Sequence, residues 1–302
     1  MIAVLGATGN TGSRIATTLL DRGHAVRVIA RSADKLASLA ARGADAVATD
    51  LTDAGAMSAG LRGVDAVYTM QPVDPTATDY RAHQRAIGDA VTEAIRAAGV
   101  ARVVALSSLG AEQPAGTGFI AALHEQEDRL RALEDARVTA LRPGLFFESF
   151  IPGVEAAREL GVLADSVSPD IALPMVAARD IADVAVAELL QPEPEPFAIR
   201  EVLGPRDLTH PDVAAAFGLP YAALPYDEMA AALVGAGLSD DVARHHVDMT
   251  RAFNEGRVHS TLRRDGRSTT PTTIEEFAAN LGTGPDLAAG ESAVGPTASR
   301  PA

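Results

Sequence analysis

The chain has 302 residues, of which 47% are hydrophobic, and it carries a formal net charge of −14. This acidic balance argues against nucleic acid and anionic membranes as partners, because both attract basic protein surfaces. The absence of cysteine excludes disulfides, thiol nucleophiles and thiolate metal sites. No signal peptide and no apolar run of about 20 residues is visible, so we expect a cytoplasmic protein.

Histidines give no sign of a metal site. The chain has seven of them, none at a metal-ligand spacing. His245 and His246 are adjacent, so on a helix they would point in different directions. We expect both at the surface, and we expect no bound metal.

A glycine motif lies between the first two apolar runs of the chain. IAVL at 2–5 precedes GATGNTG at 6–12, and an amphipathic segment leads to a second apolar run at 25–30. Strand, glycine turn, helix and strand form the context in which such a motif binds a dinucleotide. The first glycine allows a tight turn, the second lets the backbone approach a pyrophosphate, and the third lets the helix lie close to the strand. The predicted cofactor contacts here are Gly6, Thr8, Gly9, Asn10, Thr11 and Gly12.

The residue after the second apolar run indicates which dinucleotide is bound. NAD-binding folds usually place an acid there to accept the ribose 2′-OH. This chain instead has Arg31, followed by Lys35, its only lysine. A guanidinium suits a bidentate phosphate contact, which favours NADP(H). A solvated arginine at the start of a helix is the alternative.

Strands and helical segments keep alternating up to residue 150. This order predicts an α/β fold, a doubly wound parallel Rossmann sheet with helices on both faces. Further strands are expected over 44–49, 65–69, 102–106 and 137–141, with a short helix after residue 50 and longer helices over 78–98 and 119–133.

Ligands of such sheets bind at the carboxyl ends of the strands. Ser107 or Ser108 could contact the nicotinamide or polarise a carbonyl, although serine is also common in turns. Of Phe146 and Phe147, we expect one to face the ligand and one to be core. Glu125 and Glu127 are expected only to form a solvated helix face. The cofactor site is completed by Asp50, Leu51, Met70, Gln71, Pro72, Ser107, Ser108 and Phe146.

The regular alternation of strands and helical segments ends after residue 150. We expect a dinucleotide-binding domain over 1–150 and a smaller, mostly helical substrate lobe over 151–282, some of whose elements pack back on the sheet. Residues 283–302 contain hardly any large apolar side chain, which predicts a disordered tail. Within the lobe the expected elements are helices over 179–190, 211–217, 226–235, 239–254 and 272–281, and a strand over 198–203.

Five motifs together resemble the NmrA-like family, an atypical branch of the short-chain dehydrogenases/reductases. They are GATGNTG, Arg31, SSLGAE at 107–112, LRPGLFFESF at 141–150 and TIEEFAANLG at 273–282. The resemblance implies a bound NADP(H). It implies the reaction less firmly, because the family includes quinone reductases, natural-product reductases that act on iminium groups, and regulators that bind NADP without catalysis.

The chain departs from the superfamily in its catalytic residues. None of its four tyrosines is followed by lysine four residues later, so the Tyr-x-x-x-Lys pair is absent. The resemblance places His124 where relatives often carry a lysine, and Ile120 where the tyrosine would stand. His124 could donate a proton or bind the nicotinamide ribose, and a helix-surface histidine is the alternative. The candidate catalytic residues are therefore His124 and Ser107.

Two functions remain open from the sequence. The first is an NADPH-dependent reductase of a small conjugated molecule such as a quinone, enone or imine, which needs little acid catalysis. The second is a regulatory protein that senses NADP(H). The partner expected is a small-molecule substrate, and a homodimer is left open.

Overall fold

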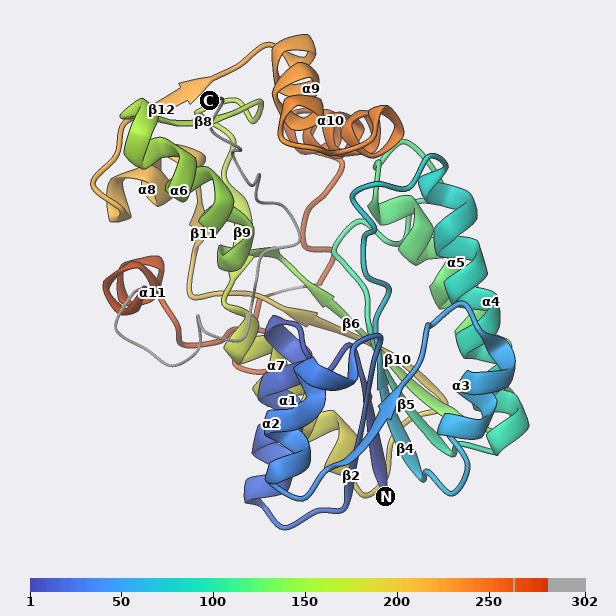
Figure 1. Ribbon diagram of the computed structural model, residues 1–302. Coiled ribbons are helices and arrows are strands. Elements are labelled where there is room, and N and C mark those ends of the chain that lie inside the picture. The colour runs from blue at the N-terminus through green and yellow to red at the C-terminus, as the bar shows by residue number, and fades with distance from the viewer. Residues whose placement is uncertain (263, 282–302) are drawn as a thin grey trace, which may run out of the picture.

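Seven parallel strands form the central sheet of the computed structural model (Figure 1). The structure describes residues 1–262 and 264–281, so the tail expected over 283–302 lies outside the described residues. The strand order is β10-β6-β5-β4-β1-β2-β3, and every neighbouring pair is parallel, as expected for a doubly wound fold. The strands are β1 (Ile2–Leu5), β2 (Val26–Ala30), β3 (Asp45–Ala48), β4 (Ala66–Thr69), β5 (Arg102–Leu106), β6 (Arg137–Pro143) and β10 (Phe197–Val202).

Helices cover both faces of this sheet (Figure 1). Strand β1 is buried throughout: Val4 packs toward one helical layer, and Ala3 and Leu5 pack toward the other. Continuous burial on both faces explains why such strands read as unbroken apolar runs in the sequence. One layer contains α1 (Asn10–Asp21), α2 (Ala33–Ala41) and α7 (Ala178–Leu190), and the other contains α3 (Ala54–Gly60), α4 (Tyr80–Ala98) and α5 (Ile120–Arg131).

A smaller lobe lies beyond the carboxyl ends of the strands (Figure 1). It contains four of the five helices expected after residue 150, since the fifth is α7 on the sheet, together with α6 over Ile151–Leu160, which was not predicted. It also contains two small sheets, β11-β9-β7 and β12-β8, which the sequence pattern did not predict because their strands have only two to four residues. Its elements are β7 (Leu145–Phe146), η1 (Phe147–Phe150), α6 (Ile151–Leu160), β8 (Leu163–Asp165), β9 (Leu173–Val176), β11 (Asp207–Leu208), α8 (His210–Ala216), β12 (Tyr221–Ala223), α9 (Tyr226–Gly235), α10 (Asp240–Asn254) and α11 (Ile274–Asn280).

The chain leaves the sheet after β6 and later returns to it. Helix α7 packs against α1, and β10 pairs with β6 in a register that places Val202 beside Pro143. The lobe is therefore connected to the sheet at several points along the chain. No helix in the described part of the chain is long and apolar enough to span a membrane.

Candidate functional site

The glycine turn between β1 and α1 uses two of its glycines for its own geometry. Gly6 has a φ of 65°, which side chains other than glycine rarely adopt. A Cβ atom on Gly12 would lie 2.2 Å from the carbonyl oxygen of Gly6, so α1 can approach β1 only with glycine there. Met70, directly after β4, covers Gly6, and a Cβ on Gly6 would lie 2.8 Å from its sulfur.

Gly9 is different, because no contact among the described residues requires a glycine at this position. A Cβ there would meet only the Gly6 carbonyl oxygen, at an ordinary 3.4 Å. Gly9 is exposed at the start of α1, and no side-chain hydrogen bond caps that helix. The neighbouring Asn10 is exposed and Thr8 is half-buried. Open space before an uncapped helix N-terminus is the arrangement that accepts a pyrophosphate. The glycine turn over 6–12, called the glycine cradle below, therefore fits a dinucleotide.

Thr11 and Leu51 point away from the cradle. The Thr11 hydroxyl lies 2.9 Å from the Tyr68 hydroxyl, and the side chain is 5% exposed. Leu51 is buried in the core between the sheet and the helices α3 to α5. Thr11 can therefore offer a ligand only its backbone N–H group, and the Leu51 side chain supports the wall from behind.

Arg31 is exposed at the end of β2, with two carboxylates near it. Hydrogen bonds from Thr52 lower the pKa of Asp50, and the positive charge of Arg31 lowers it further. The pKa of Asp74 is lowered in the same way by Thr76 and then by charges that include Arg31. The positive charge of Arg31 therefore acts on both carboxylates, although neither forms an ion pair with it among the described contacts. Lys35 is exposed on the first turn of α2, whose N-cap is Ser32.

An amide network holds the segment after β4. The side-chain amide of Gln71 donates to the backbone carbonyl of Gln84 at 3.0 Å, and the Gln84 amide donates to the Pro72 carbonyl at 2.8 Å. The other end of Gln71, its Oε1 atom, is buried and has no hydrogen-bond partner in the described residues. A buried acceptor of this kind is costly unless a ligand or water donates to it.

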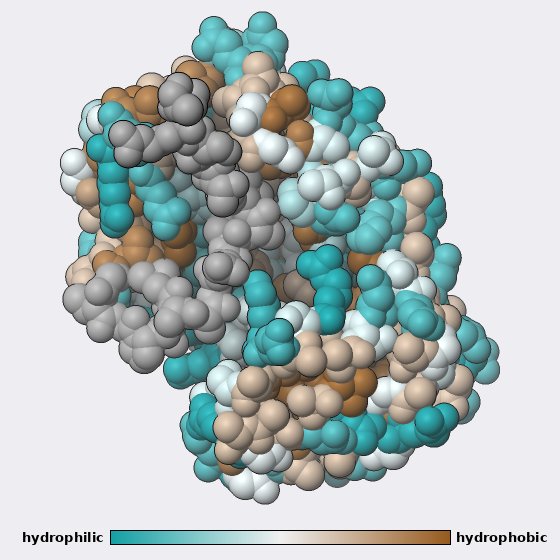
Figure 2. All heavy atoms as spheres, in the orientation of Figure 1, coloured by the Kyte–Doolittle hydropathy of each residue, from teal (hydrophilic) through white to brown (hydrophobic). Residues whose placement is uncertain are grey.

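A pocket with a volume of about 250 Å³ lies between the ends of β5 and β6 and the small lobe. Figure 2 shows this face hollowed between the lobe and the sheet domain, with hydrophobic side chains visible at the hollow. Phe146 lines the pocket, whereas Phe147 is fully buried in the core of the lobe. The lining is mainly apolar or aromatic, and its polar side chains other than the tyrosine are Gln71, Ser107, Ser108 and Ser149.

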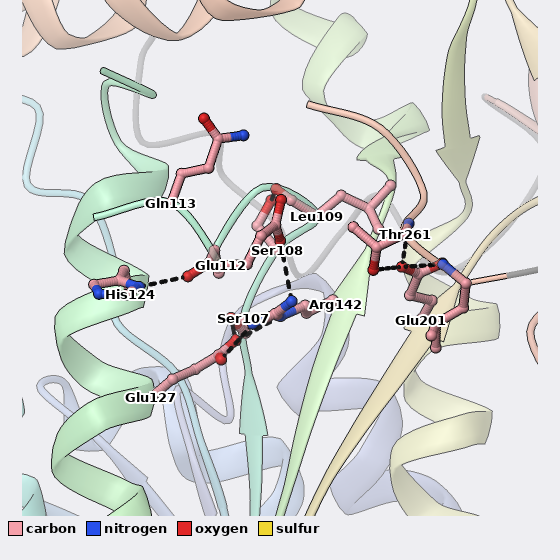
Figure 3. A network of polar contacts seen from close by, with 12 residues as sticks. Ser107, Ser108, Leu109, Glu112, Gln113, His124, Glu127, Arg142, Glu201 and Thr261 are labelled. Atoms are coloured by element: carbon pink, nitrogen blue, oxygen red, sulfur yellow. Dashed lines mark hydrogen bonds and ion pairs between the residues drawn. The ribbon is translucent and has the colours of Figure 1, made fainter. Parts of the chain in front are cut away.

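A buried ion-pair network holds Ser107 from behind the pocket (Figure 3). The Ser107 hydroxyl donates to Glu127 Oε1 at 2.5 Å, and Arg142 donates to both oxygens of Glu127 at 2.9 and 2.7 Å. Arg142 also reaches Glu112 at 3.0 Å. Burial alone would lower the pKa of Arg142, but its hydrogen bond and ion pair with Glu127 raise it, so Arg142 stays charged. The Ser107 proton is thus committed to Glu127.

The expectation that Glu127 belongs to a solvated helix face is wrong. Its residue surface is only 2% exposed, because α5 turns this side chain toward Ser107 and Arg142. Glu125, two residues earlier on the helix, is partly exposed and pairs with Arg81. The missed signal was Arg142, a charge near the end of the buried strand β6 that therefore needs a partner.

His124 does not line the pocket. Its Nδ1 atom lies 2.8 Å from the Ala111 carbonyl oxygen, and its Nε2 atom lies 3.4 Å from a carboxylate oxygen of Asp128. Figure 3 shows His124 on α5 bound to the loop that follows Ser108, apart from the side of the helix that carries Glu127. The structure therefore does not bring the two candidate catalytic residues, His124 and Ser107, together at the pocket.

The pocket wall facing α10 is aromatic. Tyr80 and Phe119 meet edge to face, with ring centroids 4.9 Å apart, and Tyr80 donates to the Phe119 carbonyl at 3.3 Å. Burial raises the pKa of Tyr80, so it is a weak acid. His245 and His246 pack around Phe119 at 6.3 and 6.2 Å and are half-buried, so their expected surface placement is wrong. Helix α10 packs against α4, which the sequence pattern could not show.

Known proteins match this arrangement. The model of a family described as NAD(P)H-binding matches residues 6–192. The NAD(P)H azoreductase of Xenophilus azovorans is 30% identical over 249 residues, which cover 80% of this chain and 84% of that protein. An oxidoreductase of Aspergillus japonicus with an NmrA-like family domain is 32% identical over 165 residues, 52% of this chain and 50% of that protein.

A solved structure with bound cofactor shares the fold. It is the NADPH-dependent quinone oxidoreductase QOR2 of Escherichia coli in complex with NADPH, which superposes with a TM-score of 0.77 at 25% identity and covers 93% of this chain and 99% of that one. The matching family and the solved complex both bind NAD(P)H, as the glycine cradle predicts for this chain. The chain belongs to the NAD(P)H-binding family, in the NmrA-like branch of the atypical short-chain dehydrogenases/reductases, and is an NAD(P)H-dependent oxidoreductase.

Proposed function

We propose that this protein uses NADPH to reduce a small conjugated acceptor of the quinone, enone or imine type. The observation that carries this proposal is the apolar pocket at the ends of β5 and β6, next to the glycine cradle, where the hydroxyl protons of Tyr80, Ser107 and Ser108 are already committed to protein acceptors. The relatives that act on azo compounds and quinones, according to their names, support the same acceptor class.

The cradle residues would hold the cofactor along the ends of β1, β2 and β4. The open space at Gly9 and the α1 N-terminus would receive the pyrophosphate, and Arg31 would pair with the 2′-phosphate of NADPH. The unpaired Gln71 Oε1 would accept a hydrogen bond from a donor on the ligand. When bound, NADPH supplies a hydride ion.

The pocket wall has little capacity for acid catalysis. Ser107 donates to Glu127, Ser108 donates to the Leu109 carbonyl at 2.9 Å, and Tyr80 donates to the Phe119 carbonyl. These groups therefore present lone pairs to the pocket. An acceptor that delocalises the negative charge it gains needs no strong acid, and water can protonate it afterwards. This property favours conjugated acceptors over isolated ketones.

His124 fits a positioning role in this proposal. Its hydrogen bond to the Ala111 carbonyl connects α5 to the loop that begins at Ser107 and Ser108. Holding this loop keeps the serines at the pocket wall. The candidate catalytic group with access to the ligand is Ser107, acting as a hydrogen-bond acceptor.

Turnover with a panel of acceptors tests the proposed function. Purified protein is mixed with NADPH and quinones, enones or imines, and loss of NADPH absorbance is followed. We expect consumption with at least one conjugated acceptor and none with matched saturated ketones. Tight NADPH binding without consumption by any acceptor would refute the proposal in favour of an NADP(H)-sensing role.

A further inference from the structure

None of the described side chains that line the pocket is charged. Apart from four polar residues and Tyr80, the wall consists of apolar groups, including Phe119, Phe146 and Phe253. An ion loses its hydration on entering such a space and gains no partner in return, which is strongly unfavourable. The pocket therefore discriminates by charge as well as by shape.

Two arginines that adjoin residues of this wall already have carboxylate partners. Arg142 lies behind Ser107 and is bound by Glu127 and Glu112. Arg81, on the same helix as Tyr80, pairs with Glu125. An anionic substituent would have to break one of these pairs to gain an arginine, which would leave a carboxylate unpaired.

Three of the polar side chains at the wall offer an anion no proton. Ser107 and Ser108 donate to protein acceptors, and the Gln71 amide donates to the Gln84 carbonyl and to Gln126. The net charge of −14 also disfavours the approach of anions.

We infer that the acceptor of this enzyme is uncharged, and that the pocket rejects acceptors with a sulfonate, carboxylate or phosphate next to the reacting group. This inference rests on the proposed function, because it names the acceptor class of the same site. In the reaction, a quinone gains a hydride and then a proton from water, so it is reduced by two electrons to the hydroquinone while NADPH is oxidised to NADP⁺.

A matched pair of quinones tests the inference. We compare 1,4-naphthoquinone with 1,4-naphthoquinone-2-sulfonate, whose charge lies beside a reacting carbonyl. The sulfonate withdraws electrons and makes the quinone a stronger oxidant, so chemistry alone predicts faster reduction of the charged compound. We expect its kcat/KM to be lower by about 100-fold or more, because the pocket cannot solvate the anion. Binding is measured separately, from the rise in Tm that each quinone causes in the presence of NADP⁺.

A single added cation should reverse the discrimination. Val73 lines the pocket and is 41% exposed, so a longer side chain fits there without disturbing the core. We expect Val73→Arg to raise kcat/KM for the sulfonate by about tenfold relative to the neutral quinone, and added salt to weaken this gain. Val73→Gln adds a longer polar side chain without the charge and should keep the wild-type ratio. Val234→Arg places the same charge on exposed α9, outside the pocket lining, and should also keep that ratio.

The outcomes separate this inference from the proposed function. Equal kcat/KM for both quinones, or the same gain with Val73→Gln as with Val73→Arg, overturns the inference and leaves the reductase function standing. If neither quinone is reduced, the Tm measurement decides: stabilisation by the neutral quinone alone supports an uncharged ligand, and equal stabilisation by both overturns it.

Discussion

The cofactor cradle and the acceptor pocket are built in opposite ways. The cradle comes from nearly contiguous chain, the turn over 6–12 and Arg31 at the end of the next strand. The pocket comes from four distant segments, around 71–80, 106–123, 143–149 and 249–258, with two more residues from β9. Turn geometry is local and can be read from residue spacing. A wall built from separate segments depends on which faces pack together, and spacing does not show this.

The sharpest test of the cradle contrasts two of its glycines. Gly9→Val should lower NADPH affinity by about 100-fold or more while the fold survives, because a Cβ there fits the protein but fills the space for the pyrophosphate. Gly12→Ala should instead lower Tm, because its Cβ would lie 2.2 Å from a carbonyl oxygen. Calorimetric titration and thermal melts check both variants. Unchanged NADPH affinity in folded Gly9→Val would show that the glycine cradle does not bind the dinucleotide.

On the pocket side of the site, which is built from distant segments, the largest loss of stability is expected for a substitution of Glu127. Glu127→Ala leaves Arg142 with only Glu112 in a buried setting, so we expect a loss of about 3–5 kcal/mol in the free energy of unfolding. The control is Glu125→Ala on the same helix, where a partly exposed pair should contribute only about 0–1 kcal/mol. Urea unfolding measures both. Equal losses would show that the two carboxylates are equivalent, as the sequence alone suggests.

A substitution of Arg31 tests whether this residue beside the cradle makes the protein prefer NADPH over NADH. Arg31→Ala should weaken NADPH binding by about tenfold to a hundredfold, since a charge-assisted contact contributes about 1.5–3 kcal/mol. NADH binding should change little, and Arg22→Ala, an exposed arginine at the end of α1, should change neither. The two affinities are measured by titration. If NADPH and NADH weaken to the same extent, Arg31 does not recognise the 2′-phosphate.

Glu148 should make the stability of the folded protein depend on pH. Burial is the main cause that raises the pKa of Glu148 to about 7, above the ordinary glutamate value of 4.5. The folded state therefore holds a proton that the unfolded state releases, so stability should decline as pH rises from about 4.5 through about 7. Glu148→Gln removes this titration and keeps an acceptor for the Ala178 N–H group. Melts from pH 5 to 8 should show a flatter Tm profile for the variant. An identical slope would contradict the assignment.

The smallest effect is expected at His124. Because its ring faces Ala111 and Asp128 and does not line the pocket, His124→Ala should lower kcat by only a few fold. His124→Gln keeps a donor for the Ala111 carbonyl and should restore most of the loss. A loss of about 100-fold or more that His124→Gln does not restore would show instead that His124 donates a proton.

The sequence by itself determined the parallel sheet, the glycine cradle and the arginine beside it. Alternating apolar runs report strands buried on both faces, and the roles of Gly6 and Gly12 follow from backbone geometry within seven residues. Family resemblance added the NmrA-like branch, which the relatives confirmed. Most of the longer helices were predicted because their periodic patterns are long enough to read, but α2 and α6, with 9 and 10 residues, were not.

Only the tertiary structure decided which side chains face the pocket. Glu127 is buried because Arg142 lies opposite it, whereas Glu125 on the same helix reaches Arg81 at the surface. Phe146 faces the pocket and its neighbour Phe147 faces the core, a choice made by the short strand β7 pairing with β9. Burial depends on the opposing surface, and that surface comes from residues far away in the chain.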